Sequence, residues 1–110
     1  MNISACVATT GVEVISCPNP STEIKAGYTS DLLSDVMGHC PENSILITVQ
    51  NHKNTVAVCT LVGAVAILVT HNREIPSDML EAARAEQVTL LRTPLDQFHA
   101  TCLIATALGT

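Results

Sequence analysis

The stretch of sequence that decides the fold is Val65-Ala66-Ile67-Leu68-Val69. All five side chains are apolar, three of them are β-branched, and Gly63 stands just before them. A strand with no polar side must be covered on both faces, as in the centre of a parallel sheet between two layers of helices. This stretch is therefore predicted to be a central parallel strand.

Predicted strands and helices alternate on both sides of this central strand. Further strands are predicted at 12–16, 45–49 and 88–91. Helices are predicted at 3–10, from Ser30 or Asp31 to Gly38, from Asn51 through 56–61 to Gly63, from Pro76 onward, and from Thr93-Pro94 to Gly109. Because the connections are short, the chain is predicted to be one α/β domain, 1–110, with a mainly parallel sheet of about four to five strands and helices on both faces.

Two aspartates fall in the helix that Ser30 or Asp31 is predicted to cap. Its apolar face comprises Leu32, Leu33, Val36 and Met37. Asp31 and Asp35 are four residues apart and would share the opposite face, where two carboxylates can serve acid–base chemistry or hold magnesium. The simpler explanation is that Asp31 caps the helix and interacts favourably with its dipole.

Composition excludes several classes of partner. The chain has a formal net charge of −5 and only five Lys and Arg residues, so we expect no nucleic acid and no anionic membrane surface as partner. The apolar run 56–69 is shorter than the ~20 residues of a membrane span and is interrupted by Thr60 and Gly63. No basic residue precedes an apolar run at the N-terminus, so no secretory signal is expected.

The cysteines and histidines match no metal or catalytic motif. Five scattered cysteines without a CxxC spacing indicate reduced thiols in a cytoplasmic protein, and Cys59 and Cys102 are predicted to be packing residues. The four histidines lack the spacings HxH, HxxH and HExxH, and no GxSxG motif is present. We therefore expect no metal, no cofactor and no nucleophilic enzyme.

The densest polar cluster, Gln50 to Asn54, follows a predicted buried strand and opens a helix. Ligands of α/β sheets bind beyond the carboxyl ends of the strands, and helix amides there attract anions. Lys53 and Arg73 would add positive charge, and Tyr28 could stack on a ligand or stand in a subunit interface. The same cluster is equally explained as a capped helix with a solvated first turn. The candidate ligand-binding residues are Gln50, Asn51, His52, Lys53, Asn54, Tyr28, Ser30, Asp31 and Arg73.

Four segments, Gly27 to Met37, Ile47 to Val58, Arg73 to Pro76 and Thr93 to Leu95, resemble the DRTGG-domain family in content and order. Members of this family occur alone and as the regulatory module of phosphotransacetylases and CBS-containing pyrophosphatases, and the N-terminal domain of HPr kinase has a similar fold. In those larger proteins catalysis lies in another domain. The resemblance therefore implies a non-catalytic sensory module, and since relatives pair through it, a homodimer.

One departure from the family concerns the motif that names it, whose place is taken here by Asn51-His52-Lys53-Asn54-Thr55. The carboxylate and guanidinium of that motif are lost, so a ligand held by those groups is not implied. We expect a small anionic ligand, a nucleotide among the candidates, or a partner enzyme or signalling protein at the strand ends. Two alternatives remain: a small enzyme that uses Asp31, Asp35 and His52, and a structural interaction subunit without a ligand.

Overall fold

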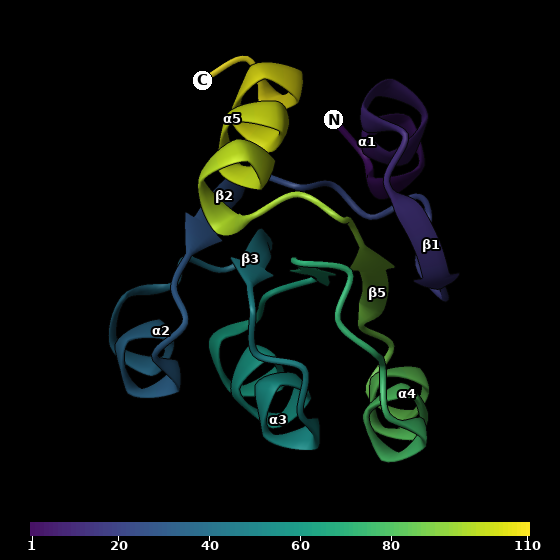
Figure 1. Ribbon diagram of the computed structural model, residues 1–110, viewed down its shortest axis with the longest axis vertical. Helices are drawn as coiled ribbons and strands as arrows, with labels where there is room; N and C mark the ends of the chain where they lie inside the picture. Colours follow the sequence, from purple (N-terminus) through teal and green to yellow (C-terminus); the bar gives the residue numbers. More distant parts are fainter.

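The computed structural model describes all 110 residues and contains five helices around a five-stranded sheet (Figure 1). The strands are β1 (Glu13–Ser16), β2 (Ala26–Thr29), β3 (Ser44–Thr48), β4 (Ala66–Val69) and β5 (Thr89–Arg92). The helices are α1 (Ile3–Thr10), α2 (Leu33–His39), α3 (Lys53–Val62), α4 (Ser77–Ala85) and α5 (Gln97–Leu108). The strand order is β1-β5-β4-β3-β2, with β2 to β5 parallel and β1 antiparallel to β5. The predicted α/β fold is confirmed.

The two strands at the centre of the sheet are buried along their whole length. β4 is the apolar stretch from which the fold was predicted, and it pairs in parallel with β3, Ile47 opposite Leu68. Every residue of both strands is buried. Full burial of a side chain such as Ile67 or Leu68 stabilises the fold by roughly 1.5–3 kcal/mol, which explains why the apolar pattern determines the position of these strands.

Helices cover both faces of the sheet, with the first and last helices of the chain on one face and the three middle helices on the other (Figure 1). Helices α2, α3 and α4 connect successive parallel strands and pack on one face, around a core that includes Leu46, Ile67 and Val69. Helices α1 and α5 lie side by side on the other face, above Ile47 and Leu68. None of the helices combines the length and apolar character of a membrane span.

Strand β2 was not predicted from the sequence. Its residues are Ala26-Gly27-Tyr28-Thr29, which include glycine and show no alternation of apolar and polar side chains. They become a strand because β3 supplies parallel pairing partners, Gly27 opposite Ile45 and Thr29 opposite Ile47. The strand lies at the edge of the sheet, where weak intrinsic preference is tolerated because only one neighbour must be matched.

Helix α2 differs from its prediction at both ends. It begins at Leu33, so Ser30 and Asp31 precede it, and the N-cap residue Leu32 makes no side-chain cap. Gly38 does not end the helix, which continues to His39 with Cys40 as C-cap. The predicted apolar face is also wrong in part: Val36 is buried, whereas Leu32 and Met37 are 60% and 55% exposed. Leu32 lies before the helix as its N-cap, and Met37 is turned by about 100° around the helix axis from the buried Val36.

The starts of α3 and α5 are displaced from the predicted caps. The N-cap of α3 is His52 rather than Asn51, and it makes no side-chain cap. The N-cap of α5 is Asp96, whose carboxylate accepts a hydrogen bond from the amide of His99 at 2.8 Å, so Thr93 and Pro94 lie before the helix. Cys59 is buried as predicted, but Cys102 is exposed on α5 and does not pack in the core.

Candidate functional site

The four parallel strands end at the same edge of the sheet, and their following loops are tied to one another. The side-chain amide of Gln50 donates to the carbonyl of Asp31 at 2.7 Å, which joins the loops after β3 and β2. The amide of Asn51 donates to the carbonyl of Glu74 at 2.7 Å, which joins the loops after β3 and β4. Arg73 adds a bond from its guanidinium to the carbonyl of Val49 at 3.3 Å. These side chains therefore form a frame across the edge.

The gap between β4 and β5 is closed by backbone hydrogen bonds. The chain leaves β4 towards α4 on one face and β5 towards α5 on the other, and ligands of α/β proteins often bind at such a divergence. Here the amides of His71 and Asn72 donate to the carbonyls of Leu95 and Thr93, each at 2.8 Å. Both donors have left-handed backbone, with φ of 59° and 51°. No opening for a ligand is left between these two loops.

The open space at this edge lies instead between the first turns of α3 and α4. A hollow of about 480 Å³ is lined there by His52, Lys53, Asn54, Pro76 and Asp78. Since α3 has no side-chain cap, its first amides and the ammonium of Lys53 attract negative charge. The carboxylate of Asp78 opposes this attraction, but it accepts a hydrogen bond from the amide of Met79 at 2.8 Å. The hollow thus favours an anion on its α3 side.

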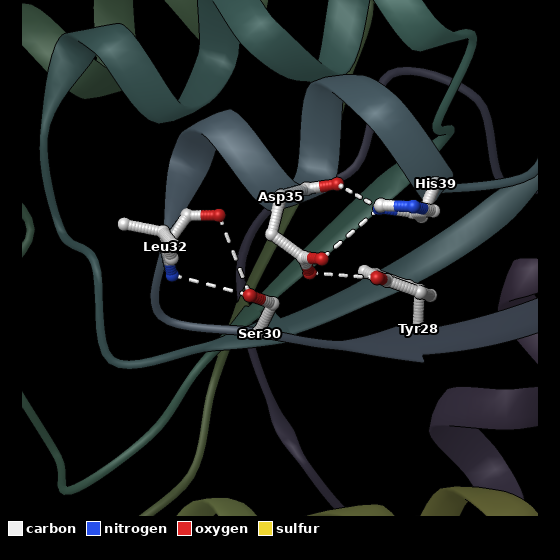
Figure 2. Close-up of polar contacts among 5 residues, drawn as sticks. All are labelled: Tyr28, Ser30, Leu32, Asp35 and His39. Atoms are coloured by element: carbon white, nitrogen blue, oxygen red, sulfur yellow. Dashed lines mark hydrogen bonds and ion pairs between the residues drawn. The ribbon is translucent and has the colours of Figure 1, made fainter.

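Tyr28 lies in a separate group of polar contacts on α2 (Figure 2). Its hydroxyl donates to a carboxylate oxygen of Asp35 at 2.6 Å, while Nδ1 of His39 lies 3.0 Å from the other oxygen. Ser30 closes the start of the helix, its hydroxyl accepting from the amide of Leu32 at 3.1 Å. Tyr28 and Ser30 therefore stabilise α2 and the residues just before it, and they do not line the hollow.

These contacts shift the titration of both partners. The hydrogen bond from Tyr28 lowers the pKa of Asp35. The same carboxylate raises the pKa of Tyr28 to about 12. An aspartate held in its charged form is a poor general base or acid near neutral pH. This geometry weakens the role of Asp35 in the alternative enzyme.

The two aspartates do not form the predicted pair on one helical face, because Asp31 lies before α2 and Asp35 within it. Of the residues predicted to bind a ligand, the structure places three on the hollow: His52, Lys53 and Asn54. Gln50, Asn51 and Arg73 use their side chains in the hydrogen-bonded frame, to which Asp31 contributes only its main-chain carbonyl.

Two residues of the hollow were not predicted, Pro76 and Asp78. Both belong to the segment Pro76-Ser77-Asp78, which was interpreted from the sequence only as the start of a helix. Helices that follow neighbouring parallel strands begin at the same edge, so α3 and α4 open side by side. This adjacency could have been used to place both helix starts in one site.

The chain matches no protein-family model and no curated protein sequence. It is similar in structure to the CBS and DRTGG domains of the regulatory region of a Clostridium perfringens pyrophosphatase, solved in complex with the activator diadenosine tetraphosphate. The TM-score is 0.78 at 18% identity, and the match covers 97% of this chain and 47% of that chain. The chain thus spans about half the length of that structure and shares its fold, as the resemblance to DRTGG-domain proteins predicted.

Proposed function

We propose that this chain is a non-catalytic regulatory module that binds a small anionic ligand, with a nucleotide as the leading candidate, in the hollow between α3 and α4. The fold supports a regulatory role, because it is shared with the regulatory region of a pyrophosphatase whose structure contains a nucleotide activator. The module would then act in the cytoplasm on a partner enzyme or signalling protein, by transmitting whether the ligand is bound.

The observation that carries the proposal is the position of Lys53 and His52 at the uncapped start of α3, on the wall of an open hollow. In a chain with a net charge of −5 and five Lys and Arg residues, positive groups directed to one hollow are scarce. Two of the others are already engaged: Arg73 bonds the carbonyl of Val49, and Arg92 pairs with Glu13 at 2.8 Å. Lys53 is left available for a ligand.

The proposed module pairs with a second copy through the layer formed by α1 and α5. Residues 1–12 and 97–110 contain no Asp, Glu, Lys or Arg, although both helices are on the surface. Phe98 is 70% exposed on this layer. Two copies that each carry a net charge of −5 repel one another least where neither has a charged side chain, so this layer is the favoured contact for a homodimer.

Calorimetry tests the ligand-binding proposal. Adenine nucleotides, pyrophosphate and phosphate are titrated into the wild-type protein and into a His52→Ala, Lys53→Ala double variant. Because both side chains are exposed, the variant should fold normally and lose most of the affinity. Absence of binding to the wild type, or equal binding to the variant, would rule out the proposed anion site. A structural interaction subunit without a ligand would then be the better description.

A further inference from the structure

A second, apolar depression lies directly beside the polar hollow. It is a groove of about 400 Å³ between α3 and α4, lined by Lys53, Val56, Ala57, Thr60, Ala82, Ala85 and Glu86. Its volume falls in the range of small-molecule sites, which are mostly apolar with a few polar groups that fix orientation. Its apolar lining comes from the short side chains of one valine and three alanines, so the groove offers a shallow apolar surface.

Lys53 is common to the groove and the hollow, which makes the two depressions neighbours along α3. From Lys53 the groove extends to Thr60, seven residues further, or about 10 Å along the helix axis. The hollow is lined by polar side chains and Pro76, whereas the groove is lined mainly by apolar ones. A ligand that fills both must therefore have an anionic end and an uncharged, apolar body.

The far end of the groove excludes a second anionic group. Glu86 lies there, and its carboxylate would repel a phosphate, although it can accept a hydrogen bond from an N–H group. A simple polyphosphate is thus confined to the hollow. A nucleotide fits the whole arrangement, since its phosphates are at one end and its flat base, with N–H donors, is at the other.

We infer that the α3–α4 groove is the base-binding half of the ligand site, so that a nucleotide places its phosphates in the hollow at Lys53 and its base over Ala57 and Ala82. This inference rests on the proposed function and deepens it, because it assigns a separate place to the base. The base contributes apolar contact that an inorganic phosphate chain cannot make. Nucleoside triphosphates should therefore bind more tightly than inorganic triphosphate, which has the same kind of anionic chain.

The test compares ATP with inorganic triphosphate, both without divalent cations, by calorimetry on three proteins. The wild type should bind ATP at least about tenfold more tightly. Ala57→Leu fills the groove from an exposed helical position, which leucine occupies without strain. This variant should bind both ligands with similar affinity and keep the wild-type affinity for triphosphate. Ser34→Leu, at an exposed position of α2 that lines neither depression, is the matched control and should preserve the tenfold ratio.

Each other outcome contradicts the inference in a distinguishable way. Equal binding of ATP and triphosphate by the wild type would overturn the base-binding groove and leave the anion site intact. Binding of neither ligand would overturn the proposed function as well. If Ala57→Leu changed the sedimentation of the protein and left the ATP preference intact, the groove would be a contact between protein copies and not a nucleotide site.

Discussion

The hydroxyl of Tyr28 donates a hydrogen bond to the carboxylate of Asp35 at 2.6 Å, which fastens the edge strand β2 to helix α2. The two residues come from elements that sequence patterns identified poorly, a strand that was not predicted and a helix with displaced ends. The carboxylate also contacts His39, so a single aspartate holds two polar side chains, one from β2 and one from α2 (Figure 2).

The Tyr28–Asp35 bond predicts an unusual tyrosine titration. Tyr28 is the only tyrosine and the chain has no tryptophan, so its ionisation can be followed by ultraviolet absorbance without interference. The pKa of Tyr28 is expected at about 12, and Asp35→Asn should move it towards the ordinary value of about 10. Asp31→Asn is the control and should leave the titration unchanged. A wild-type value near 10 would show that the bond does not persist in solution.

The Tyr28–Asp35 bond also predicts how its contribution to the free energy of unfolding changes with pH. Because folding lowers the pKa of Asp35, its contribution is present above the unfolded value near 3.9 and is lost as pH falls through the lower folded value. Because folding raises the pKa of Tyr28, its contribution is present below about pH 10 and is lost as pH rises through about 12. The difference in unfolding free energy between wild type and Asp35→Asn should therefore persist across neutral pH and shrink at both extremes.

Replacing glycines by alanine should have opposite effects at two positions. Gly38 lies inside α2 with nothing near its missing Cβ, so Gly38→Ala should stabilise the protein by about 0.5–1 kcal/mol. Gly63 ends α3 with φ of +79°, and a Cβ would lie 3.2 Å from Cγ of Glu42. Gly63→Ala should destabilise by about 1–2 kcal/mol. Urea denaturation measures both, and a destabilising Gly38→Ala would mean that the helix ends earlier than described.

Sequence patterns were sufficient where burial decided the structure. The apolar runs of β3 and β4 specified the sheet because every one of their positions is buried. They were insufficient for β2, because its pairing depends on β3. They also failed at the cap of α3, because the side chain of Asn51 bonds the distant carbonyl of Glu74 and does not cap its own helix. The anion site was predictable in part. The cluster around Lys53 is continuous in the sequence and could be recognised there, whereas Asp78 comes from the next strand–helix unit.

The uncharged layer of α1 and α5 predicts a dimer that a single charge can disrupt. Sedimentation at micromolar concentration should show a species of roughly twice 11.6 kDa. Phe98→Glu places a charge in the contact and should give the monomer, because the two copies would bring like charges together. Leu61→Glu changes an exposed apolar residue on α3 and serves as the control, which should remain dimeric. A wild type that sediments only as the 11.6 kDa species would contradict the pairing.

The most direct test of the anion site is an amide NMR titration of the intact protein with pyrophosphate. The largest chemical-shift changes are expected at residues 52–54, with smaller ones at 76–78, because these segments line the hollow between α3 and α4. Lys53→Ala should abolish the changes in both segments. If pyrophosphate at millimolar concentration left these amides unchanged, or shifted only residues of α1 and α5, the assignment of the ligand site to this hollow would be contradicted.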